Sequence, residues 1–485
     1  MSNVTVRGRE TFVARNARKL ADPRRHVQRA YDPSARAFVE RPREKVADRN
    51  ELALRVKAAL DTAGTGSYLL GYDLYPELVD ALYDRTPLLQ FIETAQATSK
   101  VHEYRTRLTY PRPVFQGEGA SASSTSGTYG TGNVTLKIAR GYPEVTGFLE
   151  ATSKSFADAL IEELAGAVHG IGEFMEYSLL WANDVDTYQV KGLAEWLEAD
   201  ATAKVSNIFD HDGTVTLTLL DNMLNAVKLA SWSGDAMLWL MSTSMAQKVS
   251  TLQTRANIQL SPGQPFEGAM VMNTYGNIPI LEADYITPRT TSPSVSASAS
   301  ESGGTLGAAY YYYAISAVNV EGEQFHGTAS SRMTISGSTG SVALTWTGST
   351  SAQLYRVYRS VGDTLNTADD LKLIKVIAAK TYDGSGNVTG LVESFTDTGY
   401  TAISTVHPLA SASNDSTIWL VNTEADRGLT MLGNIDDDGR PIAEMWRLVE
   451  LARTKDSFPM MLKIYFANLA KYPTAHAIAR RVRVS

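Results

Sequence analysis

The sequence predicts an α+β protein that is interrupted near its C-terminus by an all-β domain. A long helical pattern occupies Ser155–Asn183, and a mixture of short helices and strands follows over residues 191–289. A series of short strands begins after the low-complexity segment Ser292–Gly304, and the mixed pattern returns at residue 413. An insertion into a mixed domain is the simplest account of that order, and 485 residues suffice for two or three domains.

Residues 1–64 predict an N-terminal arm that cannot fold alone. Residues 1–60 hold 15 Lys/Arg against 7 Asp/Glu, although the whole chain has a net charge of −7. A basic arm on an acidic body favours an acidic partner, either protein or nucleic acid, and the alternative is a solvated tail without a partner. Its apolar residues are too sparse to bury much surface, so order is expected only against another segment or chain. The expected contact residues of the arm are Arg24, Arg25, Arg29, Tyr31 and Phe38.

Residues 65–97 predict an initial segment built on a short helix. Proline is favoured in a first helical turn, so Tyr75-Pro76-Glu77 is expected to open the helix, and Thr86-Pro87 to end it. The apolar residues from Leu88 to Ile92 are expected to pack in the centre of the molecule.

Residues 98–146 predict an extended β-hairpin loop. Val101–Tyr110 alternates and is rich in β-formers, and Val134–Ile138 alternates on the return. Gly117–Gly132 between them is a run dominated by Gly, Ser, Thr and Ala, with almost no apolar content. Such a long structureless connection is uncommon inside a compact domain, so it is expected to touch another subunit. The expected contact residues are Tyr110, Phe115, Glu118, Tyr129 and Lys137.

Residues 147–190 are dominated by the long helix, whose apolar residues recur at three-to-four spacing. Over about 25 residues, at about 1.5 Å each, such a helix is about 40 Å long. Residues 191–289 are expected to place a sheet at the centre of mixed material. The elements expected there are a helix over Leu219–Leu229, a strand over Ala236–Met241, a helix over Ser244–Leu252 and a strand over Ile278–Leu281.

Residues 290–412 predict a β-sandwich that folds as an independent module. Turns recur every 10 to 15 residues or so between short alternating strands such as Tyr310–Val318 and Leu354–Arg359. Trp346 is expected in the core of this domain, and the alternative is a ligand platform. The mixed domain resumes over 413–485, with strands at Ile418–Val421 and Met460–Phe466. The expected core residues of the insert are Tyr311, Tyr313, Trp346, Val357 and Phe395.

Composition and motifs predict neither an enzyme nor a metal or cofactor site. The chain has no cysteine, which excludes disulfides, thiolate zinc sites and cysteine nucleophiles. Asn434–Gly439 (NIDDDG) resembles the start of a calcium loop, but Met445 stands where a bidentate Glu is required. Asp210–Gly213 (DHDG) has the composition of a turn. Because residues 1–19 are polar and arginine-rich, a secretory signal is not expected, and no window holds the roughly 18 unbroken apolar residues that span a membrane.

The order of these segments resembles the major capsid proteins of tailed bacteriophages, which have the Hong Kong 97 fold. Tyr72–Ile92 looks like the first segment of that family, Thr98–Thr146 like its extended loop and Ser155–Asn183 like its spine helix. Lys191-Gly192-Leu193 looks like the short strand that leads to the axial domain, and Leu469–Ala477 like the closing strand. The insert resembles immunoglobulin-like or fibronectin-III modules in the segments Tyr311–Gly322, Val342–Thr347, Tyr355–Arg359 and Phe395–Gly399.

The resemblance implies a capsid protein that assembles in the bacterial cytoplasm and forms the icosahedral shell of the virion from hexamers and pentamers. The implied partners are further copies of the chain, portal and scaffolding proteins, a decoration protein, and packaged double-stranded DNA held without sequence readout. Some shells of this fold crosslink through a loop lysine. Lys137 lies in the return strand and not at the loop tip, so crosslinking is not expected. The alternatives are an encapsulin-like compartment, a surface adhesin and a soluble enzyme.

Overall fold

The computed structural model describes the chain in segments. They cover residues 27–32, 37–42, 87–97, 99–107, 109–116, 118, 121, 125–146, 156–230, 236–255, 273–283, 286–403, 406–410, 414–424, 427–434, 446–451 and 457–484. The predicted helix at Tyr75, the arm residues Arg24 and Arg25, and most of the NIDDDG segment lie outside the described residues.

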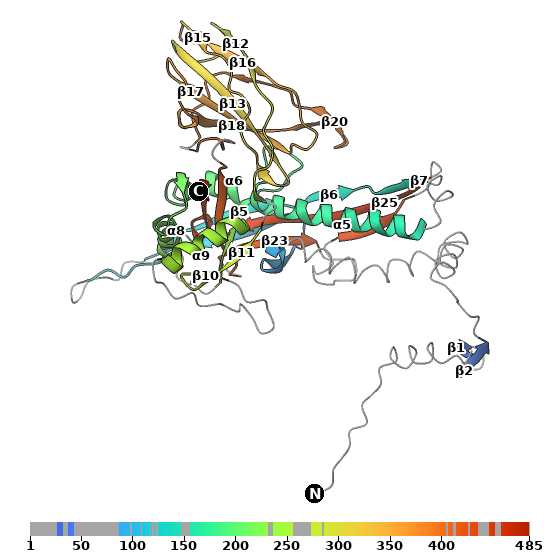
Figure 1. Cartoon of the computed structure of the whole chain (residues 1–485). Helices are drawn as coiled ribbons and strands as arrows, with labels where there is room; N and C mark the ends of the chain where they lie inside the picture. Colours follow the sequence, from blue (N-terminus) through green and yellow to red (C-terminus); the bar gives the residue numbers. More distant parts are fainter. Residues whose placement is uncertain are drawn as a thin grey trace.

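A six-stranded mixed sheet forms one end of the body (Figure 1). Strand β22 is antiparallel to both of its neighbours, whereas β11 runs parallel to β9 and β26 parallel to β8. In order across the sheet, the strands are β10 (Thr274–Tyr275), β11 (Ile278–Glu282), β9 (Met237–Met241), β22 (Ser416–Asn422), β26 (Ala477–Arg483) and β8 (Ile208–Thr214).

Both faces of this sheet are buried, which explains its unbroken apolar strands. Trp239 and Ile418 face a core shared with helices α8 (Leu217–Ala230) and α9 (Thr243–Arg255). Their neighbours Leu240 and Trp419 face the opposite core. The apolar runs of the predicted strands therefore serve two separate cores.

The second part of the body is elongated and is built on helix α5 (Phe156–Leu180), a helix of 25 residues. Figure 1 shows α5 lying along the 14-residue strand β25 (Ser457–Ala470). Val168 and Ile171 are buried in the same core as Leu462. The other strands of this sheet, arranged around β25, are β24 (Trp446–Glu450), β23 (Leu429–Asn434), β3 (Glu93–Ala97), β6 (Lys137–Gly141) and β7 (Glu144–Thr146).

The segment before β3 packs in the centre, as its apolar residues indicated. A 3₁₀ turn, η1 (Pro87–Gln90), places Leu88 fully inside the core, and the Leu88 amide donates to the Glu176 carboxylate at 2.8 Å. Further towards the N-terminus, β1 (Val27–Asp32) pairs with β2 (Ala37–Pro42) in a small antiparallel ribbon.

The predicted hairpin pairs β4 (Val101–Arg107) with β5 (Tyr129–Thr135). The structureless run predicted over Gly117–Gly132 extends too far, because residues 129–132 belong to strand β5. Gly132 stands opposite Tyr104, and a Cβ on Gly132 would lie 2.5 Å from that ring. The glycine therefore makes room for a cross-strand ring and does not break the strand.

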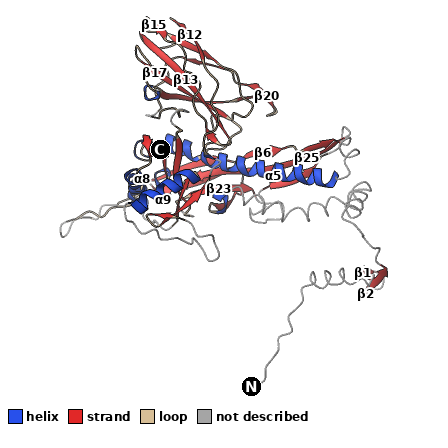
Figure 2. Ribbon diagram, in the orientation of Figure 1, coloured by secondary structure: helices blue, strands red, loops and turns tan. Residues whose placement is uncertain are grey.

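The insert is made of antiparallel strands and stands on top of the body in Figures 1 and 2, where the helices lie below it. Its first sheet joins β12 (Ser296–Ser300), β16 (Ser341–Thr345) and β21 (Ser394–Asp397). Its second sheet joins β14 (Gly322–Glu323), β13 (Ala309–Asn319), β17 (Leu354–Val361) and β18 (Lys372–Ala378), with β15 (Met333–Ile335) also on β13. A separate hairpin pairs β19 (Lys380–Tyr382) with β20 (Val388–Leu391).

Three local predictions were wrong. The expected strand Lys191–Leu193 is the start of helix α6 (Leu193–Ala199), because Leu193, Ala194 and Leu197 bury one helical face. The expected turn Asp210–Gly213 belongs to β8, where pairing with β26 overrides turn composition. The expected closing strand Leu469–Ala477 is mostly a connection through the 3₁₀ turn η6 (Pro473–Ala475), and β26 closes the sheet.

Candidate functional site: a projecting hairpin

The outer end of the hairpin gathers exposed apolar side chains. The Phe115 side chain is 107% exposed, and those of Tyr110 and Tyr129 are 70% and 64% exposed. Val114 is exposed beside them. In Figure 1 the strands of this hairpin, in cyan, lead away from the body. The structure thus places Tyr110, Phe115 and Tyr129 in the same projecting segment.

Arg107 joins the two tyrosines, and the sequence analysis missed this residue. Its guanidinium lies 5.3 Å from the centre of the Tyr110 ring and 5.4 Å from that of Tyr129. Arg107 stands directly opposite Tyr129 in the strand register. A cation above two aromatic rings holds them in place while leaving their other faces open to a partner. The signal available in the sequence was the charged residue at every second position of β4, namely Glu103, Arg105 and Arg107.

Pairing between the two hairpin arms continues beyond the strands. The Thr109 amide donates to the Thr128 carbonyl at 3.3 Å, and their hydroxyls lie 2.7 Å apart. A Cβ on Gly127 would lie 2.6 Å from the Thr109 carbonyl oxygen, so glycine lets the two backbones approach. The arms are therefore still held together at Thr109 and Thr128, just beyond the paired strands.

The hairpin is anchored only at its base. Val134 and Leu136 are buried beside Ala97 and Leu469. Within the part of the chain that the structure describes, no side chain from 101 to 133 belongs to a buried core, and only Tyr104 packs against one. A two-stranded hairpin without a covered face is marginally stable in water. Its outer half therefore gains most from contact with a second surface.

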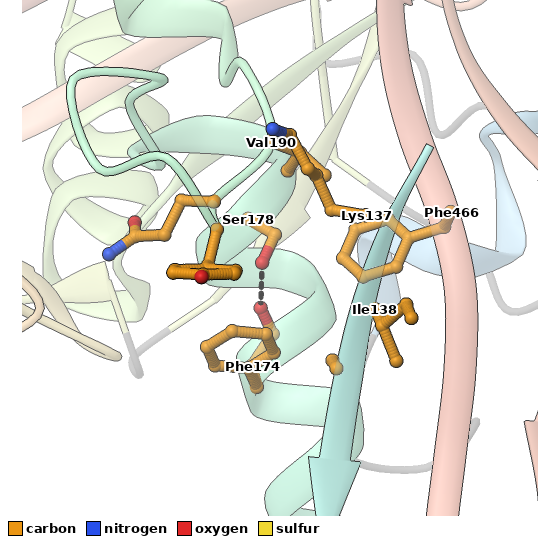
Figure 3. Close-up of a pocket in the computed structure, with 9 residues that line it drawn as sticks. Lys137, Ile138, Phe174, Ser178, Val190 and Phe466 are labelled. Atoms are coloured by element: carbon orange, nitrogen blue, oxygen red, sulfur yellow. Dashed lines mark hydrogen bonds between the residues drawn. The ribbon is translucent and has the colours of Figure 1, made fainter. Parts of the chain in front are cut away.

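Lys137 does not join the other predicted contact residues. It opens β6, and its ammonium donates to the Thr187 carbonyl at 2.6 Å. Figure 3 shows it beside a small cavity formed with Ile138, Phe174, Val190 and Phe466. Lys137 thus ties the return strand to the loop that follows α5. Glu118 is exposed near the hairpin end.

The predicted arm residues are described only in part. Arg29 and Tyr31 lie on β1, and Phe38 lies opposite Tyr31 on β2. Their side chains lie outside the described part of the chain, so their role as contacts stays a prediction.

The predicted core residues of the insert lie between its two sheets. Tyr311, Tyr313, Trp346 and Val357 are buried in a common cluster, and Phe395 packs half-buried against it. Burial and the neighbouring Asp397 carboxylate raise the pKa of the Tyr313 hydroxyl, which donates to that carboxylate at 3.0 Å. The Trp346 ring meets the Tyr355 ring edge-on at 5.3 Å. Trp346 is thus a packing residue.

The described part of the chain contains no group of three His, Cys, Asp or Glu residues arranged to hold a metal ion. Its helices include none that is both long and apolar enough to cross a membrane.

Comparison with known proteins found similarity among solved structures only. No protein-family model and no curated protein matches the chain. The chain is similar to the SrpI encapsulin of Synechococcus elongatus, with 10% identity over 82% of this chain and 88% of that one and a TM-score of 0.42. It is also similar to the capsid of an empty GTA particle, with 9% identity over 82% and 90% and a TM-score of 0.41.

A third similar structure is that of Mycobacterium phage Patience, with 10% identity over 86% of this chain and 87% of that one and a TM-score of 0.40. All three TM-scores lie below 0.5.

Proposed function

We propose that this chain is a shell-forming subunit, the major capsid protein of a tailed bacteriophage. The supporting observation is the β4–β5 hairpin, which carries a fully exposed Phe115 and three further exposed apolar residues. Among its described residues from 101 to 133, none belongs to a buried core. A surface of this kind is costly in a protein that stays monomeric and useful in one that is covered by its neighbours.

A shell repeats one weak contact between subunits many times. Burying one Phe side chain contributes about 1.5–3 kcal/mol, which is too little for a stable pair of subunits. A closed shell repeats the same contact at every subunit, so weak contacts accumulate through symmetry. The hairpin suits this use because aromatic residues bury a large area with few rotatable bonds.

A shell role for this chain implies a particular assembly, further partners and a position for the insert. Hexamers and pentamers would make up an icosahedral head, built in the host bacterial cytoplasm with scaffolding and portal proteins and able to take a decoration protein. The basic residues 1–60 would contact packaged double-stranded DNA through its phosphates. The insert would be an immunoglobulin-like domain displayed on the outer surface, with no membrane involved.

The test is the state of assembly of the full chain, measured by light scattering and electron microscopy. Closed particles support the proposal, and a monodisperse monomer at the highest attainable concentration overturns it. Particles that hold nuclease-protected DNA support the phage capsid. Particles filled with protein cargo and free of nucleic acid favour the encapsulin alternative.

A matched pair of variants tests whether the hairpin carries assembly. Phe115→Asp is expected to abolish particles while the subunit stays folded, because a carboxylate cannot enter an apolar contact without a large desolvation cost. Val205→Asp is the control, since Val205 is 83% exposed on helix α7 (Ala203–Ser206), which packs against α6, β8 and η6. Normal assembly of Phe115→Asp would remove the hairpin from the contact.

A further inference from the structure

The outer face of the larger insert sheet is covered by the body of the same chain. Along β13, Tyr313 and Ile315 point into the core of the insert, while their neighbours Ala314 and Val318 belong to the main core of the body. The strand β17 divides in the same way, with Tyr358 on the body side. The insert therefore shares a continuous apolar core with the body.

Buried charges cross this junction in both directions. Glu323 of the insert pairs with Arg480 of the C-terminal strand β26, and both side chains are almost fully buried. Arg356 of the insert pairs with Glu198 of α6 and lies 3.6 Å from Glu323. Each side thus supplies one cation and one anion to the other, which leaves little net charge in the interface.

The Glu323 carboxylate is the centre of this cluster. It accepts from the Tyr358 hydroxyl at 2.5 Å and from the Ser316 hydroxyl at 2.7 Å. Burial alone would raise the pKa of Glu323, but Arg480 and Arg356 together hold that pKa below its ordinary value. The carboxylate is therefore charged inside the junction, where a charge persists only with partners.

A bulge in β26 brings a second arginine to the junction. Arg481 has a φ of 57°, and the pairing of β26 with β8 shifts register at this point. Without the bulge, Arg480 and Arg481 would point to opposite faces of the sheet. With it, Arg481 pairs with Asp369 of the insert as well as with Asp210 and Asp212 of β8.

A second attachment lies on the loop that follows α5. The Tyr382 hydroxyl of the insert donates to the Asp186 carboxylate at 2.8 Å, and the Tyr382 and Tyr188 rings are 4.6 Å apart. Gln189 donates to the Gln353 carbonyl at 3.2 Å. Attachments at two separate places oppose rotation of the insert about its connecting segments.

We propose that this face of the insert is a binding surface for the chain's own C-terminal strand, and that Glu323 and Arg480 form a latch that makes insert and body one rigid cooperative unit. The expectation of an independently folding module is replaced by this one. Removing the insert would take away the partners of Arg480 and Glu198 and uncover the apolar face on which it packs. The inference does not depend on the shell proposal.

Native-state hydrogen exchange of the full chain tests the proposal directly. Amides of β13 and β17 in the insert and of β22 and β26 in the body are expected to exchange through the same opening, with equal free energy and equal dependence on denaturant. Insert amides that exchange through a separate opening of lower free energy would overturn it.

A matched pair of variants adds a second measurement. Glu323→Gln keeps the shape but leaves Arg480 buried without its anion, so exchange of both insert and body amides is expected to accelerate by about a hundredfold or more. Glu321→Gln, two residues earlier, removes only the half-exposed pair with Arg289 and is expected to leave exchange unchanged. Acceleration confined to the insert in Glu323→Gln would refute the latch. The wild-type measurement decides the question if that variant does not fold.

Discussion

His476 should make the stability of the body depend on pH in a calculable way. The residue is fully buried between β25 and β26, and its Nδ1 accepts from the Asn422 amide at 3.1 Å. Burial lowers its pKa from 6.5 to about 3. Between about pH 3 and pH 6.5 the folded protein therefore holds this imidazole neutral while the unfolded chain protonates it.

Proton linkage sets the direction and the size of the change in the free energy of unfolding with pH. The stabilisation from neutral His476 is fully present above pH 6.5, the ordinary value, and is lost as the pH falls towards about 3. At pH 5.5 the unfolded chain is about ten times more protonated at this residue than not. Protonation of the unfolded chain therefore lowers the free energy of unfolding at pH 5.5 by about 1.4 kcal/mol relative to pH 7.5.

The assay is denaturant unfolding of the unassembled subunit at pH 7.5 and 5.5, for the wild type and for His476→Asn. The Asn side chain cannot titrate, and its amide oxygen can still accept a hydrogen bond. The wild type is expected to lose about 1.4 kcal/mol more than the variant over this interval. Equal losses in the two proteins would refute the assignment of a neutral buried imidazole, whatever the variant's stability at pH 7.5.

Four further substitutions have expected outcomes, three of them in thermal or denaturant unfolding and one in hydrogen exchange. Tyr313→Phe removes a buried hydrogen bond to the Asp397 carboxylate and should lower the free energy of unfolding by about 1.5–3 kcal/mol. Tyr312→Phe removes an exposed hydrogen bond to the Asp363 backbone carbonyl and should change that free energy by less than about 0.5 kcal/mol. Trp419→Ala should cost about 3–5 kcal/mol, because this fully buried ring packs in the core shared by insert and body. Gly132→Val should increase hydrogen exchange along β4 and β5, because the valine side chain would displace the Tyr104 ring. Combining Gly132→Val with Tyr104→Ala should restore protection of these amides. Unchanged exchange in Gly132→Val alone would contradict the contact between Gly132 and Tyr104.

The local periodicity of apolar residues predicted much of the fold. The three-to-four spacing within Ser155–Asn183 predicted α5, and the apolar run at Ala236–Met241 predicted β9. The low-complexity boundary near residue 290 and the return of mixed elements near 413 predicted where the β-rich segment lies. The glycine- and serine-rich connection after Val101–Tyr110 predicted the hairpin whose exposed end is the candidate contact surface. Each of these signals lies within a few neighbouring residues, which is why the sequence alone contained it.

Tertiary structure decided what depends on residues far apart in the chain. The turn-like composition of Asp210–Gly213 became a strand because β26 pairs with it, more than 260 residues later. Nothing near Glu323 in the sequence indicates that it meets Arg480, 157 positions away, or that their meeting joins the insert to the body. A buried ion pair is stabilised by geometry and by exclusion of water, and both arise only when distant segments are brought together. The sequence by itself determined most of the elements, and the packing of those elements determined the rest, which charges are buried and how the insert is held.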